Sequence, residues 1–105
     1  MEKDLTDAFR SQRDFAHARL LIPTFSLAVF DYCFYFGGSV TSWLRSQRRN
    51  RLVGGVDHSF HIYGLAADVV LDDFSMSTVA DREAFAAALG LKLIFEGSHD
   101  HLMLL

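Results

Sequence analysis

The sequence is poor in features that mark several other protein classes. It has one cysteine, Cys33, which excludes an internal disulfide, and this residue sits in an apolar run where it is expected to be a small buried hydrophobe. Basic residues do not dominate, because the formal net charge is −3. A general attraction to nucleic acid is therefore not expected, even though residues 45–51 are locally basic.

No export signal and no membrane-spanning stretch are evident either. Residues 1–5 are acidic and mixed, without the basic region and apolar core of a secretory signal. The apolar run 20–36 is interrupted by Pro23 and Asp31, and it falls short of the roughly 18–20 uninterrupted apolar residues that a bilayer requires. We expect a buried element there and no membrane span, and the sequence leaves both localisation and oligomeric state open.

The chain contains enough hydrophobic residues to form one small core. Half of its 105 residues are hydrophobic and ten are phenylalanine, so a single domain covering 1–105 is expected. Its N-terminal part, about 3–36, is predicted to be helical, with an amphipathic helix over about 3–20 and an apolar one over about 24–36. Pro23 is predicted to end the first helix with Ile22 extended, and Thr24 to cap the second.

The remainder, about 39–105, is predicted to be mostly strand. A helix over about 78–89, capped by Ser77 or Thr78 and ended by Gly90, interrupts strands expected at 39–43, 65–71, 91–96 and 99–104. The third of these strands is expected to place Leu91, Leu93 and Phe95 on one face, and the opposite face to carry Lys92, Ile94 and Glu96. Helices first and then strands with one helical insertion indicate an α+β fold, with a small, largely antiparallel sheet and flanking helices.

The stretch 59–68 carries the first group of chemically informative residues. It reads S-x-H-x-x-G-x-A-x-D, with His61 and Asp68 seven positions apart. An odd separation would put them on opposite sides of one flat strand, so a turn or bulge must lie between them. Gly64 allows that turn at low steric cost.

A second stretch, 96–101, brings a carboxylate and two more imidazoles near the C-terminus. Glu96 precedes His99 and His101, which are two positions apart and therefore share one face of a strand. With His61 and Asp68, these residues offer the kind of donor set that catalytic zinc uses, three protein ligands with one position left for water. Asp100 points to the opposite face of that strand and is expected to be solvated.

The two stretches together resemble the zinc D-Ala-D-Ala peptidase family, which shares its metal core with hedgehog signalling domains and murein endopeptidases. That group carries S-x-H-x-x-G-x-A-x-D early and a glutamate followed by H-x-H late, and the resemblance covers about 40–105. It implies that His61, Asp68 and His101 hold Zn²⁺. It also implies that Glu96 is the general base and that His99 stabilises the oxyanion or donates a proton.

The resemblance also extends to T-S-x-x-R-S, which here ends in Arg45 and Ser46. It implies that Arg45 binds a carboxylate or carbonyl oxygen of the substrate, a task suited to a forked planar donor. The neighbouring Arg48, Arg49 and Arg51 read as a solvated basic loop. In this chain the glutamate lies one residue closer to H-x-H than in hedgehog-type members, which leaves the reach of Glu96 open.

Two alternatives remain at this stage. Some members of the family use E-x-x-H, a spacing that Glu96 and His99 also fit, so His99 competes with His101 as the third ligand. The implied function is hydrolysis of peptidoglycan stem peptides, as a D-Ala-D-Ala carboxypeptidase or an L-Ala-D-Glu-type endopeptidase, in a phage enzyme or one acting at the cell wall after release. The rival is a non-catalytic zinc-containing binding module on the same fold.

Overall fold

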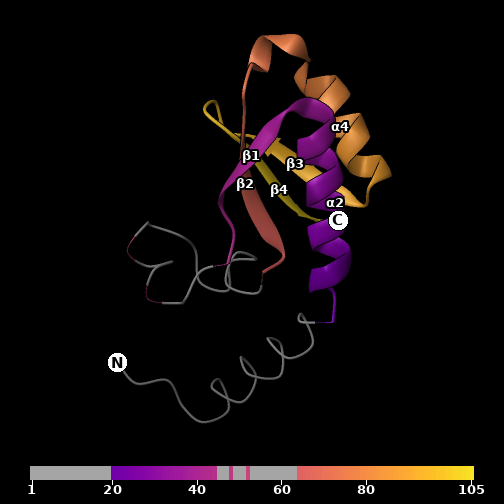
Figure 1. Ribbon diagram of the computed structural model, residues 1–105, viewed down its shortest axis with the longest axis vertical. Coiled ribbons are helices and arrows are strands. Elements are labelled where there is room, and N and C mark those ends of the chain that lie inside the picture. Colours follow the sequence, from indigo (N-terminus) through magenta and orange to yellow (C-terminus); the bar gives the residue numbers. More distant parts are fainter. Residues whose placement is uncertain (1–19, 45–47, 49–51, 53–63) are drawn as a thin grey trace.

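A computed structural model describes residues 20–44, 48, 52 and 64–105 of the chain (Figure 1). In chain order, the elements of this part are α2 (Ile22–Phe36), β1 (Gly38–Ser42), β2 (Ala66–Leu71), the 3₁₀ helix η1 (Phe74–Met76), α4 (Val79–Ala88), β3 (Leu91–Phe95) and β4 (Asp100–Leu104). The four strands form one sheet in the order β1-β2-β4-β3, with every neighbouring pair antiparallel. The predicted α+β class is confirmed.

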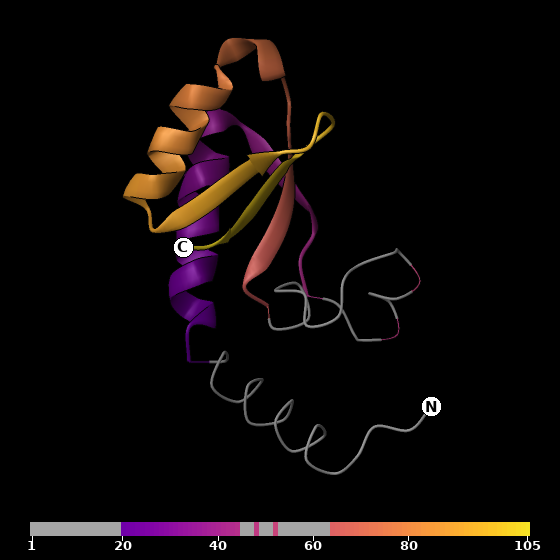
Figure 2. The ribbon, with the colours of Figure 1, turned by 180° about the vertical axis from the view of Figure 1, so that it is seen from behind.

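Both helices lie on the same face of the sheet, and the view from behind shows the strands in front of them (Figure 2). The core is therefore a single layer between helices and sheet. From α2 it takes Phe25, Val29 and Tyr32, and from β2 it takes alternate residues. The opposite, outer face of the sheet carries no helix among the described residues, so side chains that alternate with the core residues project away from it.

The start of α2 differs from the prediction. The helix begins at Ile22, and Pro23 lies in its first turn, so Ile22 is helical and Thr24 is not the cap. Proline is favoured there because the N–H group it lacks would have no partner within the helix in any case. Gly37, with φ 71°, ends the helix as predicted. The predicted helix over about 3–20 lies outside the described residues, except for its last position.

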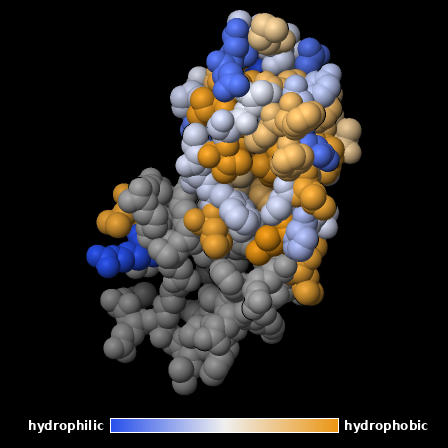
Figure 3. Space-filling view, viewed as in Figure 1, coloured by the Kyte–Doolittle hydropathy of each residue, from blue (hydrophilic) through white to orange (hydrophobic). Residues whose placement is uncertain are grey.

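One side of α2 is apolar yet exposed. Leu27, Phe30 and Phe34 are each more than 60% exposed, and apolar side chains gather on the face of the molecule seen in Figure 3. The Phe30 and Phe34 rings stack with their centroids 6.2 Å apart. No helix in the described part of the chain is both long enough and apolar enough to cross a bilayer.

The rest of the fold follows local sequence signals closely. Thr78 caps α4, its side-chain oxygen accepting a hydrogen bond from the Asp81 backbone N–H at 3.1 Å, as the sequence predicts. Each observed strand lies within one residue of its predicted bounds. On β3, Leu91 and Leu93 are buried while Lys92 and Ile94 are exposed, as predicted. Phe95, expected on the face of the leucines, is exposed at the end of the strand.

Candidate active site

The two central strands bring Asp68 and His101 together. They are direct partners in the β2–β4 ladder, and the Nδ1 atom of His101 lies 2.9 Å from Oδ1 of Asp68. The neighbours of Asp68 on β2, Ala67 and Val69, belong to the core, so Asp68 projects from the outer face. Gly64, just before β2, has φ 72°, the left-handed conformation expected of the glycine within the motif.

The turn between β3 and β4 supplies the other two polar groups. The Glu96 backbone N–H donates to the His99 carbonyl at 2.9 Å, which closes a tight turn over Gly97 and Ser98. In this turn, Oε2 of Glu96 lies 3.5 Å from Nε2 of His99, and Oε1 of Glu96 lies 4.0 Å from Nδ1 of His101. The short spacing noted in the sequence therefore does not keep Glu96 away from the histidines.

Asp68, Glu96, His99 and His101 thus form one group, called here the outer-face cluster. Its fourth contact joins Nε2 of His99 to Oδ1 of Asp68 at 3.8 Å. Side-chain exposure rises through the cluster, from 14% for Asp68 and 18% for His101 to 27% for His99 and 46% for Glu96. Asp68 and His101 therefore form its floor, and Glu96 its solvent-facing rim.

The donor chemistry of this floor fits a zinc ion. Tetrahedral zinc with bonds of 2.0–2.1 Å holds its ligand atoms about 3.3 Å apart, close to the 2.9 Å between the Asp68 oxygen and the His101 nitrogen. Within residues 20–44, 48, 52 and 64–105, however, no group of three or more His, Cys, Asp or Glu side chains has a metal-holding arrangement. The predicted third donor, His61, lies outside the described residues, and so does Arg45.

Behind the cluster lies a charged group that the sequence interpretation missed. Asp100 was expected to be solvated, and this is wrong: it is fully buried on the helix side of β4. Its Oδ2 atom accepts hydrogen bonds from the Tyr32 hydroxyl at 2.6 Å and from Arg82 Nε at 2.9 Å, and its Oδ1 atom accepts one from Arg82 Nη2 at 3.3 Å. Asp100 does face away from His101, as strand alternation requires.

Arg82, on α4, is itself almost completely buried. Its Nη1 atom donates to the Ser77 carbonyl and hydroxyl oxygens, both at 3.2 Å, and its guanidinium carbon lies 5.3 Å from the ring centroids of both Phe74 and Phe95. Burial, followed by the Asp100 carboxylate, raises the pKa of Tyr32, so its hydroxyl stays a hydrogen-bond donor. One signal was available in the sequence: Asp100 has the same parity as Leu102 and Leu104, which places it at a core position.

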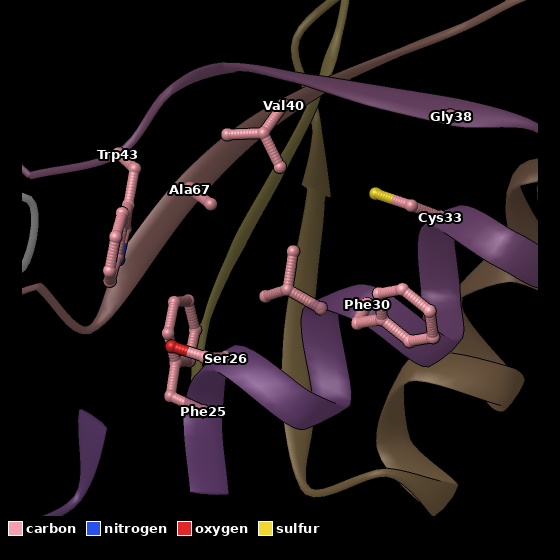
Figure 4. Close-up of a pocket in the computed structure, with 9 residues that line it drawn as sticks. Phe25, Ser26, Phe30, Cys33, Gly38, Val40, Trp43 and Ala67 are labelled. Carbon is pink, nitrogen blue, oxygen red and sulfur yellow. The ribbon is translucent and has the colours of Figure 1, made fainter. Parts of the chain in front are cut away.

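A pocket of roughly 310 Å³ lies on the other side of the sheet, between α2 and β1 (Figure 4). Its walls are mostly apolar, including Phe25, Phe30, Val40 and Trp43, with the Cys33 sulfur pointing into it. Cys33, which the sequence predicted to be buried, is only partly buried, and this partial burial raises the pKa of its thiol. Ala67 lines this pocket while its neighbour Asp68 faces away, so the pocket is separate from the outer-face cluster.

Comparison with known proteins bears directly on this geometry. A family model described as peptidase M15 matches residues 34–102, more than half of the chain and all of the outer-face cluster. The chain belongs to the peptidase M15 family. Membership supports a metallopeptidase role and bears out the resemblance read from the motifs. The searches of curated proteins and of solved structures gave no match.

Proposed function

We propose that this member of the peptidase M15 family is a zinc-dependent peptidase that hydrolyses peptidoglycan stem peptides. The bond cleaved would be an amide next to a D-amino acid, as in a D-Ala-D-Ala carboxypeptidase or an L-Ala-D-Glu-type endopeptidase. The observation that carries the proposal is that the carboxylates of Asp68 and Glu96 lie 2.9 Å and 4.0 Å from Nδ1 of His101 on the outer face of the sheet. A substrate of this kind implies action at the cell wall after release, as in phage-encoded enzymes.

The residues divide the work between binding and proton transfer. His61, Asp68 and His101 would hold Zn²⁺, which in such a site supplies Lewis-acid polarisation of the scissile carbonyl. His101 is preferred to His99 as the third ligand because it is the direct ladder partner of Asp68 and the less exposed of the two, 18% against 27%. Arg45 would bind a carboxylate or carbonyl oxygen of the peptide.

Glu96 would act as the general base. Its carboxylate lies at the exposed rim, where it can accept a proton from the attacking water and pass it to the leaving amine as the C–N bond breaks. His99, 3.5 Å from Glu96, would stabilise the oxyanion or share the proton. Its ring is oriented by Ser98, whose hydroxyl lies 2.8 Å from Nδ1 of His99.

The test is cleavage of purified peptidoglycan and of synthetic stem peptides, followed by mass spectrometry of the products with and without a chelator. Glu96→Gln should lower kcat by about 10²–10⁴-fold while Zn²⁺ remains bound, because only the proton acceptor is lost. Glu83→Gln is the matched control, since Glu83 is an exposed carboxylate on α4 at the helix side of the sheet. It should leave turnover unchanged.

Two results would contradict the proposal. Full activity in Glu96→Gln would remove the assigned base. Stoichiometric Zn²⁺ without any chelator-sensitive cleavage would instead favour a non-catalytic zinc-containing binding module on the same fold.

A further inference from the structure

The end of β4 that carries the histidines has little apolar anchoring of its own. Residues 99–101 are all polar, so at this end of β4 the side chain on the core face is that of Asp100 and no apolar side chain replaces it. Its pairing with β3 is set through the tight turn at Gly97 and Ser98. That turn is exposed, and the ladder with β2 ends at the pair Val69 and Asp100, so Asp100 is the last residue of this end that the sheet holds on both sides.

Asp100 provides that contact at the position between the two histidines. Three hydrogen bonds from Tyr32 on α2 and Arg82 on α4 converge on its carboxylate, and no part of Asp100 is exposed. Arg82 is in turn fixed by Ser77 and lies over the rings of Phe74 and Phe95. Phe95 is the ladder partner of Asp100, so both strands of the hairpin end are held by the same guanidinium.

We propose that Arg82 is a positioning residue: by holding Asp100 it holds His99 and His101 beside Asp68 and Glu96. Successive side chains on a strand point to opposite faces, so a fixed backbone at position 100 fixes both neighbouring imidazoles on the outer face. The positioning itself is a property of the metal-free fold, and its consequence for zinc rests on the function proposed above.

A purely stabilising role explains this arrangement less well. A buried ion pair is weak evidence for stability, because apolar residues of similar volume often serve as well or better. Apolar contacts are not directional, because their free energy depends on the buried area and does not fix the orientation of the groups. A forked guanidinium bound to a carboxylate fixes both the distance and the angle between the two groups. Metal ligands on the neighbouring residues must be held in such a defined orientation.

The decisive variant is the triple substitution Tyr32→Phe/Arg82→Met/Asp100→Val, which replaces the buried polar group by apolar side chains of roughly similar total volume, removes the directional bonds and leaves the hydroxyl of residue 32 out, so that it is not buried without a partner. We expect it to melt close to the wild-type temperature, yet to bind Zn²⁺ about tenfold more weakly in a competition titration. Tenfold is the lower end of the loss in metal affinity that follows when groups that orient the ligands are removed. In the metal-free protein, the ring ¹⁵N signals of His99 and His101 should broaden or shift. Wild-type histidine signals together with wild-type affinity in this variant would overturn the proposal.

A second pair of variants decides the matter if the triple variant does not fold. Tyr32→Phe removes one bond to Asp100 and should shift the same histidine signals in the same direction, by less. Val29→Ala, in the core of α2 but without a polar contact to Asp100, should lower the melting temperature and leave those signals in place. Equal shifts in both variants, or none in Tyr32→Phe, would contradict the proposal that the hydrogen bonds to Asp100 position the histidines. If the wild-type protein binds no Zn²⁺, the proposed function fails while the histidine signals still test the positioning.

Discussion

The two faces of the sheet use charge in opposite ways. On the helix face, Arg82 and Asp100 are fully buried and every polar atom they bury has a partner. On the outer face, each of the two imidazoles lies within 4.0 Å of both carboxylates, and all four side chains remain partly exposed. The two groups are adjacent in the sequence, because Asp100 lies between His99 and His101.

The buried charges and the exposed charges contribute differently to stability and to function. Removing one partner from a buried, bonded ion pair is costly, because the other charge is left unpaired away from water. Ion pairs in solvent are worth little, and grouping two carboxylates on an open face has no evident value for folding. The outer-face cluster is therefore best explained by what it binds, and the buried group by what it holds in place.

The largest expected effect that would test this comparison comes from Arg82→Met. It should lower the free energy of unfolding by about 3–5 kcal/mol, because Asp100 stays buried without its cation. Urea denaturation followed by circular dichroism measures it. A loss below about 1 kcal/mol would mean that the buried group does not behave as a charge pair.

Tyr32→Phe should have the next largest effect on the same face. The hydroxyl that donates to Asp100 at 2.6 Å is lost while both ring contacts of the side chain remain, so the expected loss is about 1.5–3 kcal/mol. The same denaturation experiment serves, with Tyr35→Phe as control because Tyr35 is largely exposed. Equal losses in the two variants would contradict a specific role for the buried hydroxyl.

A smaller effect should appear at alkaline pH. Burial and then Asp100 raise the pKa of Tyr32 above its ordinary value of about 10, so the folded protein keeps a proton that the unfolded chain releases. The stabilisation from this proton is fully present below pH 10 and declines above it, with a limiting slope of about 1.4 kcal/mol per pH unit. We would measure the free energy of unfolding of the wild type and of Tyr32→Phe between pH 9 and 11 and take the difference. This difference isolates the contribution of the Tyr32 proton, and a difference that does not change with pH would contradict the prediction.

The smallest effect on stability is expected on the outer face. His99→Gln in the metal-free protein should change the free energy of unfolding by no more than about 0.5 kcal/mol, as for most substitutions of partly exposed side chains. Chemical denaturation in the presence of a chelator measures it. A loss as large as that of Tyr32→Phe would erase the contrast between the two faces.

Local signals explain the parts of the fold that the sequence predicted well. Thr78 caps α4 and Gly37 ends α2 because both act within a few residues of themselves. The start of α2 was misplaced because Pro23 is compatible both with ending one helix and with opening another. Glu96 was assigned to the site from the sequence, but its reach to the histidines was decided only by the tight turn that follows β3.

From the sequence alone came the family motif, the α+β class, and Asp68, Glu96, His99 and His101 as one chemical group; His61 and Arg45 remain predictions, because they lie outside the described residues. The tertiary structure decided which strands lie side by side, and with that the 2.9 Å contact of Asp68 with His101. The parity of Asp100 along its strand indicates the core face, but only the tertiary structure decided its bonding partners, which lie 68 and 18 positions away, because no local pattern encodes a contact over that separation.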